Sequence, residues 1–407
     1  MKSNYSELGK YIREVNECNS DLAITNLLGV SMEKTFIQSV ANLNGVDMSV
    51  YKVLRNEQLA CKLMSVGRDE KLPVDLYREQ EPSIISSAYY VFEPKDKEEL
   101  LPEYLMMWLC RPENDRYIGF ISGGDVRGGI SWETFCSLPI KVPSISKQKE
   151  IVKEYDVIQN RIALNQQLIQ KLEETAQAIY KAWFVEFEFP DENGKPYKSN
   201  GGEMVFNEEL EKEIPKGWAV ISVKEFCKEM KSGGTPSRDN NNYWNSRDIP
   251  WLKTGEVCNR VLVKAEEYIS DEGCKNSSAK KLPINTVLIA MYGEGKTKGQ
   301  AGYLRFEATT NQACCAMICN NEFDSTFLYY FLRINQSEIA NLANGGAQPN
   351  LSKELIENFR IISPNSKDIC KHHFVKFINH SEILERENQN LTELRDLLLS
   401  KLATREK

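Results

Sequence analysis

The sequence has no long apolar run. None of its hydrophobic stretches approaches the roughly 18 residues that a helix needs to cross a bilayer. The first 17 residues are polar and lack the hydrophobic region of a signal peptide. The 11 cysteines are scattered irregularly, with Cys314 and Cys315 adjacent, which is typical of reduced thiols rather than of a disulfide framework. These features predict a cytoplasmic protein that has no contact with a membrane.

An excess of basic residues is also missing. The chain has 51 Lys and Arg residues against 58 Asp and Glu residues, a net charge of −7. A protein that binds nucleic acid alone usually carries a basic balance. Any nucleic-acid role must therefore depend on local basic patches, or be shared with a more basic partner. The sequence also lacks an Asn- or Asp-Pro-Pro-aromatic tetrapeptide, so it carries no signature of a methyltransferase.

Residues 147–183 contain neither proline nor glycine and predict one long helix. Its apolar positions are spaced alternately by three and four residues, which predicts packing along a partner helix. A helix of this length would extend roughly 55 Å. Its one polar seam residue, Asn165, is the kind that sets register at some cost in stability. The seam consists of Ile151, Tyr155, Ile158, Ile162, Asn165, Ile169, Leu172, Ala176, Ile179 and Trp183.

A second helix of the same kind is predicted from residue 366 to about residue 405. Its seam includes Leu384, Leu391 and Leu398, which are one heptad apart. The two helices belong to a wider internal duplication. Residues 104–109 are echoed by residues 327–332, 122–131 by 344–352, 138–143 by 359–364, and 165–168 by 388–391, at offsets of 221 to 223 residues. Four pairs in the same order at one offset indicate a duplicated chain.

The predicted fold class is therefore α+β, with two mixed α/β domains and two long antiparallel coiled-coil helices related by a pseudo-two-fold axis. The first domain is expected to begin with a short helix at residues 5–16, and residues 287–291 are the clearest buried strand of the second. The predicted division is an N-terminal domain at 1–146, a central helix at 147–189, an exposed linker at 190–217, a C-terminal domain at 218–365 and a final helix at 366–407.

Two globular heads on a helical spacer suit a polymer with a repeating lattice. DNA is such a polymer, because two half-sites lie on one face when they are roughly 34–36 Å apart. The two heads differ in most of their sequence, so each is expected to bind a different short sequence. The alternative from another class is a coiled-coil scaffold that joins two protein-binding heads, and the acidic charge is its main support.

Several segments resemble the specificity (S) subunit of type I restriction-modification systems, and the resemblance covers essentially the whole chain. It is carried by residues 165–184, 232–257, 275–300, 309–317 and 388–402. The resemblance implies two target-recognition domains that each bind half of a bipartite site in double-stranded DNA. It implies helices that set the gap and dock two methyltransferase subunits, with restriction subunits joining through the complex. It also implies a subunit without chemistry or cofactor of its own, S-adenosylmethionine and ATP being bound by its partners.

Three motifs suggest other chemistry but fit it poorly. Residues 290–297 (AMYGEGKT) match a permissive phosphate loop, yet Gly299, Gly302 and a strand-like run follow where such a loop needs a helix. Asp191 with Glu229 and Lys231 only faintly resembles a nuclease motif, and residues 191–194 are better interpreted as a turn. Cys370, His372, His373 and His380 would spread around a helix, so no metal site is predicted. Residues 314–319 are expected to lie in a buried strand.

The candidate DNA-contacting residues are Lys, Arg, Asn, Gln, Ser, Thr and Tyr side chains and glycine-rich loops. Lys and Arg can pair with guanine, Asn and Gln with adenine, and backbone amides with phosphate. In the first domain the candidates are Lys62, Ser65, Arg68, Ser86, Ser87 and Arg127. In the second domain they are Ser232, Gly233, Gly234, Thr235, Lys253, Lys280, Tyr292, Lys296, Lys298, Gln300, Asn311, Gln312 and Gln348.

Overall fold

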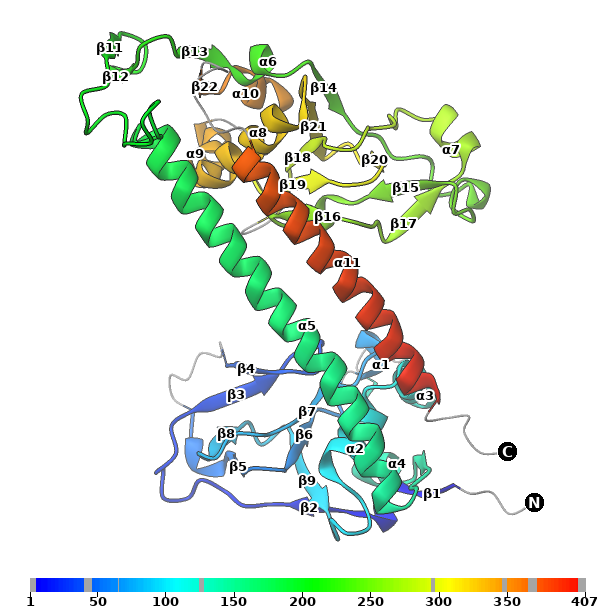
Figure 1. Ribbon diagram of the computed structural model, residues 1–407. Helices are drawn as coiled ribbons and strands as arrows, with labels where there is room; N and C mark the ends of the chain where they lie inside the picture. The colour runs from blue at the N-terminus through cyan, green and yellow to red at the C-terminus, as the bar shows by residue number, and fades with distance from the viewer. Residues whose placement is uncertain are drawn as a thin grey trace. The chain divides into compact units, whose positions relative to one another are not determined.

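The computed structural model describes residues 5–39, 46–64, 66–123, 128–293, 297–345, 350–364 and 372–401, without the side chains of residues 68, 344, 345, 372 and 373. The chain forms two compact units (Figure 1). Unit 1 comprises Met1–Ile162 with Asn390–Lys407, and unit 2 comprises Ala163–Gln389. Each unit therefore combines one globular head with parts of both long helices.

Unit 1 has two four-stranded sheets, in the orders β2-β9-β6-β7 and β4-β3-β8-β5, and a two-stranded pair, β1-β10. The strands are β1 Ser6–Glu7, β2 Ile12–Val15, β3 Leu27–Val30, β4 Phe36–Gln38, β5 Lys52–Leu54, β6 Leu59–Cys61, β7 Val74–Leu76, β8 Ser83–Ile85, β9 Tyr90–Pro94 and β10 Pro139–Ile140. The helices are α1 Val66–Asp69, α2 Pro102–Leu109, α3 Pro112–Ile121 and α4 Trp132–Cys136, with 3-10 turns at Leu8–Lys10 and Met48–Val50.

The sheet of β6 and β9 is buried on both faces. Leu59 and Cys61 belong to one apolar cluster with α2, while Ala60 belongs to a second cluster with Leu54 and Ile85. This division follows from the two-residue period of a strand, which sends successive side chains to opposite faces. Helix α2 begins at Pro102, which suits the first helical position because proline has no N–H to leave unpaired.

Unit 2 has a five-stranded sheet in the order β14-β21-β18-β19-β16, a three-stranded sheet β17-β15-β20, and the pairs β11-β12 and β13-β22. The strands are β11 Met204–Asn207, β12 Lys212–Pro215, β13 Ala219–Ser222, β14 Glu229–Ser232, β15 Ile249–Leu252, β16 Arg260–Leu262, β17 Glu267–Ile269, β18 Val287–Ala290, β19 Ala301–Leu304, β20 Thr309–Thr310, β21 Cys314–Ile318 and β22 Arg360–Ser363. The helices are α6 Val223–Phe226, α7 Asp271–Lys275, α8 Glu322–Ile334, α9 Gln336–Asn341 and α10 Lys353–Asn358, with 3-10 turns at Asn241–Tyr243, Thr254–Glu256 and Leu342–Gly345.

The predicted buried strand at residues 287–291 is confirmed by β18, whose four residues are all buried. Val287 and Ile289 contribute to the apolar cluster that also contains α8, while Leu288 and Ala290 contribute to the cluster on the other face. Strands covered on both faces read as continuous apolar runs, which is why this strand was visible in the sequence. The neighbouring β21 confirms the predicted buried strand around Cys314 and Cys315 in the same way.

The two long helices are α5, Ile145–Tyr180, which continues as a π-helical turn at Lys181–Val185, and α11, His372–Lys401 (Figure 1). Within unit 2 they run antiparallel, since Asn165 contacts Asn388 while the ring of Tyr180, further along α5, lies 6.0 Å from that of Phe374 near the start of α11. The seam positions are buried at Ile158, Asn165, Ala176 and Leu384, and half-buried at Ile151, Tyr155, Ile162, Ile169, Leu172, Ile179, Trp183, Leu391 and Leu398.

The internal duplication is repeated in the backbone hydrogen bonds of the two heads. The N–H of Ile130 donates to Leu63 in unit 1, and that of Leu351 donates to Met291 in unit 2. In the same way the N–H of Lys62 donates to Pro73, and that of Ala290 donates to Gln300. Each pair joins equivalent elements of its own head, so the predicted α+β fold with two related heads is confirmed.

Two segments differ from the sequence-based expectation. Residues 5–16 form β1, a 3-10 turn and β2 rather than a helix, because β2 pairs antiparallel with β9 from Ile12 to Val15. Residues 190–217, expected to be an exposed linker, include the hairpin of β11 and β12. Ile214 in this hairpin is buried, and the ring of Phe189 stacks on those of Tyr197 and Trp218.

Candidate nucleic-acid interface

Three loops of unit 2 leave the same end of the five-stranded sheet. The register aligns Ser232, the last residue of β14, with Cys315, and Ala290, the last residue of β18, with Cys314 at the start of β21. Strand β19 begins at Ala301, directly opposite Ile289 of β18. Residues 233–235 and 311–313, together with residues 291–293 and 297–300 between β18 and β19, therefore project from one end, which we call the loop end of unit 2. Most of the candidate residues of the second domain lie there.

Hydrogen bonds join two of these loops to each other, and one of them to the turn after β15. The hydroxyl of Thr235 donates to Gln312 Oε1 at 2.6 Å, and the N–H of Gly234 donates to the carbonyl of Thr310 at 2.8 Å. The hydroxyl of Thr254 donates to Asn311 Oδ1 at 2.9 Å. The structure thus gathers the side chains of Thr235, Asn311 and Gln312 into one polar cluster. Gln312 is exposed, so its amide can also face a ligand.

Gly233 and Gly234 were predicted to contact DNA, and the structure provides a packing reason for both. A Cβ atom at Gly233 would lie 2.1 Å from the carbonyl oxygen of Asn311, and one at Gly234 would lie 2.1 Å from Ser278 Oγ. No side chain fits at such distances, so only glycine allows the backbone to approach so closely. These glycines shape the loop end by bringing residues 278–279 and 310–311 against it. Ser232, beside them, is exposed.

Lys253 lies near the cluster but is held by acidic side chains. Its Nζ is 2.9 Å from Glu267 and 3.3 Å from Glu266. The hydrogen bond with Glu267 raises the pKa of Lys253 above its usual range. Glu267 also binds Arg238, whose guanidinium stacks 3.5 Å from the ring centre of Trp244. A phosphate would therefore compete with two carboxylates for Lys253.

The loop between β18 and β19 carries the remaining described candidates. Tyr292 is exposed, Lys298 and Gln300 are half-buried, and Gly299 has a φ of +80° that glycine adopts without strain. Strand β19, not a helix, follows Thr297 within four residues, so the segment lacks the helix N-terminus on which a phosphate loop depends. Lys280 is exposed and follows Ala279, which contacts the loop end. Lys296 and Gln348 lie outside the described residues.

Unit 1 has the equivalent end. Cys61, the last residue of β6, is aligned with Tyr90, the first residue of β9, so the segments that follow and precede them lie together. The ammonium of Lys62 lies 6.0 Å from the ring centre of Tyr89, and the N–H of Tyr89 closes a turn on the carbonyl of Ser86. Ser87 is exposed. The backbone of Arg68 is in α1 but its side chain is not described, and Ser65 and Arg127 lie outside the described residues.

Two residues at these ends were not predicted from the sequence. Tyr89 accepts a hydrogen bond from the N–H of Val30 at 3.3 Å and supports Lys62, so it connects both sheets of unit 1 at the loop end. Thr254 positions Asn311 in unit 2. Both are uncharged residues beside predicted candidates, and only the pairing of distant strands reveals their place.

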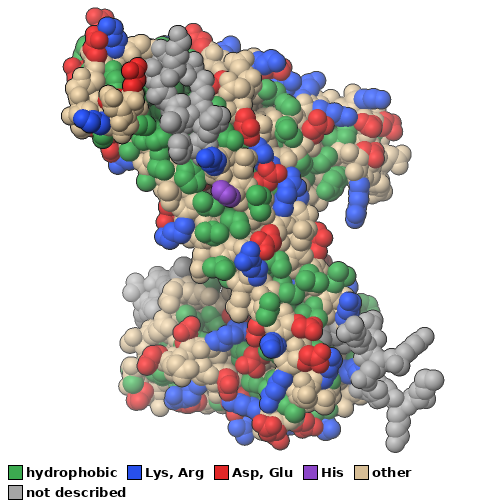
Figure 2. Space-filling view, viewed as in Figure 1, with side chains coloured by type: hydrophobic (Ala, Val, Ile, Leu, Met, Phe, Trp, Pro, Cys, Tyr) green, Lys and Arg blue, Asp and Glu red, His purple; other side chains and the backbone are tan. Residues whose placement is uncertain are grey.

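The surface shown in Figure 2 is not uniformly basic, since Lys and Arg side chains alternate with Asp and Glu side chains over both units. Of the described segments, none is a helix long and apolar enough to cross a membrane. Within the same residues, no group of three or more His, Cys, Asp or Glu side chains could hold a metal ion.

Comparison with known proteins places the chain among DNA specificity proteins. The family described as "Type I restriction modification DNA specificity domain" matches residues 76–174 and 215–394. The chain is 28% identical over 318 residues to the MjaIX specificity subunit of Methanocaldococcus jannaschii, covering 75% of this chain and 69% of that protein. It is 25% identical over 423 residues to the HindI specificity subunit of Haemophilus influenzae, covering 89% of each.

A solved structure shares the fold. The S subunit of a type I restriction-modification system from M. genitalium matches with a TM-score of 0.53 and 14% identity, covering 98% of this chain and 95% of that one. At this identity the match concerns the fold alone.

Proposed function

The chain belongs to the type I restriction modification DNA specificity family, and from this premise we propose that its two loop ends each recognise one half of a bipartite DNA target. Its role is DNA-target recognition within a restriction-modification system. In the proposed division, residues 1–146 and 218–365 are the two recognition domains, and residues 147–189 and 366–407 are the helices that set the gap between the half-sites.

The repeated loop end carries this proposal. In each head, one strand ends where its neighbour in the sheet begins: β18 beside β21 in unit 2, and β6 beside β9 in unit 1. Polar side chains gather at this end of the sheet in both heads. The side chains differ, however: Lys62 beside Tyr89 in unit 1, and Thr235 with Gln312 in unit 2. A guanine favours a cationic donor, while an amide matches adenine. Equivalent positions with different chemistry suit a target whose two halves have different sequences.

The long helices also offer a surface for partners. Val157, Leu164 and Leu168 are exposed on one face of α5, at 63%, 54% and 47%. In unit 1, α5 and the end of α11 border a groove of about 570 Å³ that contains Val157, Leu394 and Leu397. Exposed apolar side chains of this kind mark protein-binding surfaces. We propose that two methyltransferase subunits dock along these helices in the cytoplasm, that restriction subunits join through them, and that S-adenosylmethionine and ATP bind to those partners.

The experiment is to reconstitute the chain with its candidate methyltransferase and to map modified bases by long-read sequencing. A bipartite motif with an unspecified gap is expected. If an active methyltransferase modifies no such motif, the proposal is wrong, and the alternative of a scaffold joining two protein-binding heads, which the family does not favour, would regain support.

Side-chain variants assign each half of the motif to a loop end. Gln312→Ala should weaken selection at one position of one half-site by about 1–3 kcal/mol, because one base loses a paired amide. The other half-site and the gap should not change. Ser87→Ala is expected to affect only the opposite half-site. The matched control is Gln170→Ala, since Gln170 is an exposed glutamine on α5, hydrogen-bonded to Glu174; a change of motif in this control would contradict the assignment.

A further inference from the structure

Arg305 lies at the end of the unit 2 sheet that is opposite the loop end. Strand β19 leaves the loop end at Ala301 and finishes at Leu304, one residue before Arg305. The backbone N–H of Arg305 donates to Leu262 at the end of β16, and Asn285, in the turn before β18, donates to Leu304. Arg305 is therefore placed away from any bases bound at the loop end, although it directly follows the strand that begins there.

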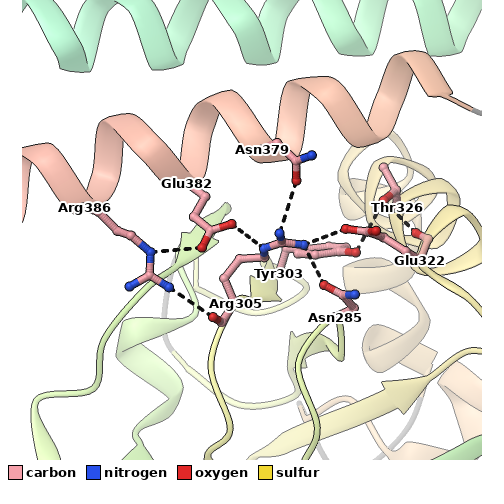
Figure 3. Close-up of polar contacts among 8 residues, drawn as sticks. All are labelled: Asn285, Tyr303, Arg305, Glu322, Thr326, Asn379, Glu382 and Arg386. Carbon is pink, nitrogen blue, oxygen red and sulfur yellow. Dashed lines mark hydrogen bonds and ion pairs between the residues drawn. The ribbon is translucent and has the colours of Figure 1, made fainter.

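The guanidinium of Arg305 binds four side chains from three elements (Figure 3). Its Nε donates to Glu382 on α11 at 2.6 Å, and one terminal nitrogen donates to Asn285 and to Glu322 at 2.7 Å each. The other terminal nitrogen donates to Asn379 of α11 at 3.2 Å. The side chain is 18% exposed, as is that of Glu382. One residue thus joins the sheet, α8 and the long helix α11.

Helix α11 binds the same strand end a second time. Arg386 donates to Glu382 at 2.9 Å and to the backbone carbonyl of Arg305 at 3.2 Å (Figure 3). Asn379, Glu382 and Arg386 lie three or four residues apart, so they share one face of the helix. The end of β19 is consequently held through both its side chain and its backbone.

Such a cluster restricts the position of α11 against the head more than it stabilises the fold. Buried ion pairs gain little net free energy over well-packed apolar residues, because desolvation offsets the attraction. A guanidinium, however, presents its N–H groups in a rigid plane, so its partners must keep one direction and one distance. Apolar contacts between α11 and the head, such as Phe374 and Ile378 in the main cluster of unit 2, permit sliding and rotation that the guanidinium does not.

The other head is attached to its helix differently. Arg78 follows β7 as Arg305 follows β19, and its charge partly offsets the burial that raises the pKa of Asp156 on α5. Its side chain, however, is 58% exposed, lies 3.7 Å from Asp75 and donates to the carbonyl of Leu76 in its own strand. At the 223-residue offset between Asn165 and Asn388, the counterparts of Asn379 and Glu382 are Asp156 and Gln159. The four-partner arrangement around Arg305 is thus a feature of unit 2 and not a general consequence of the duplicated fold.

We propose that Arg305 is a positioning residue that fixes the orientation of the C-terminal recognition domain on α11 and thereby restricts the gap between the two half-sites. This inference rests on the proposed function. One additional base pair in the gap moves the second half-site by roughly 3.4 Å and turns it by roughly 35° about the duplex. A recognition domain that is held rigidly on its helix cannot adjust to this shift or to this turn. A recognition domain that can rotate on apolar contacts adjusts in part to both.

The test uses the reconstituted methyltransferase complex with DNA substrates that keep both half-sites and vary the gap by one base pair in each direction. Wild type is expected to methylate one gap. Arg305→Met should raise the relative rate on the two neighbouring gaps by about tenfold with both half-site sequences unchanged. Glu382→Gln keeps the shape of the side chain and removes its charge, so it is expected to give a smaller shift in the same direction. Arg305→Lys retains the positive charge but lacks the planar guanidinium, and should also raise the relative rate on the neighbouring gaps.

Arg360→Met is the matched control. Arg360 forms a carboxylate pair in the same unit, with Glu209 at 2.5 Å, but it joins β22 to the hairpin region and not to α11. Loss of stability alone would lower the rate on every substrate and leave the preferred gap unaltered. An unchanged gap preference in folded Arg305→Met and Glu382→Gln would overturn the inference, as would an altered half-site. If the wild-type complex itself recognises no gapped motif, it is the proposed function that fails.

Discussion

Replacing Asn165 and Asn388 by leucine, singly and together, tests how the two long helices recognise each other. Asn165 is 1% exposed and Asn388 is 9% exposed. The side-chain amide of Asn165 donates to Asn388 Oδ1 at 3.0 Å. The two residues are also equivalents in the internal duplication, so a residue here contacts its own repeat. A contact between equivalents lies on the local two-fold axis of the helix pair.

The magnitudes follow from burial. Each single substitution removes this hydrogen bond and leaves one amide without that partner in an apolar seam, at a cost of about 1–3 kcal/mol. The leucine returns roughly 1.5–3 kcal/mol through apolar burial, so each single variant should stay close to wild type. The double variant buries two leucine side chains and has no side-chain amide left at either position. We therefore expect a coupling free energy of about 1–2 kcal/mol between the two positions, and a double variant that is more stable than wild type.

Native-state hydrogen exchange measures this quantity in the intact protein. The opening free energy of amides in α5 and α11 on either side of the pair is compared among the four proteins of the cycle. The control cycle places leucine at the exposed positions Gln167 and Asn390, where no coupling is expected. Additivity within about 0.5 kcal/mol at the Asn pair would refute the reasoning. So would a double variant that is less stable than both single variants.

Three further predictions concern groups inside the units. Arg333→Met should destabilise unit 2 by about 3–5 kcal/mol in urea unfolding, because Glu173, 3.0 Å away, would lose the charge that partners it. Burial raises the pKa of Glu173, so the folded state binds more protons than the unfolded chain just above the ordinary Glu pKa. The contribution of Glu173 to stability therefore falls as pH rises through that window, and Glu173→Gln should remove this dependence. Burial raises the pKa of the thiols of Cys314 and Cys315 to about 12. The folded protein should therefore react with iodoacetamide first at the exposed Cys18 and Cys258. Early labelling of the buried pair would contradict the structure.

The helices and the buried strands could be predicted because their signals are local and long. The heptad spacing placed Asn165 in the seam, and the duplication made the second long helix the natural partner of the first. The apolar run at 287–291 is a strand covered on both faces. The rejection of a phosphate loop at 290–297 also rested on a local feature, the strand that starts at Ala301.

The remaining features depend on partners that are distant in sequence. Residues 5–16 have an adequate helical composition, but β9 lies some 80 residues away and offers a sheet edge to Ile12–Val15. Tertiary pairing of this kind overrides a weak local preference. Lys253 was a reasonable DNA contact from its motif, and nothing near it in sequence indicates that Glu266 and Glu267 hold it. The strands of the hairpin at 204–215 are four residues each and mostly not buried, so the segment resembles a linker until the pairing of the strands is known.

The charge distribution bears on how this chain divides work with its partners. Two cations near the loop end of unit 2, Lys253 and Arg238, are engaged by Glu267, and the chain as a whole carries a net charge of −7. Phosphate contacts supply much of the affinity of a DNA-binding protein but no sequence information, whereas contacts to base edges, the role that we propose for Gln312 and Thr235, read the sequence. We therefore expect the chain alone to bind DNA weakly, and we propose that partner subunits supply most of the phosphate contacts. Recognition and affinity would then both be complete only in the assembled complex.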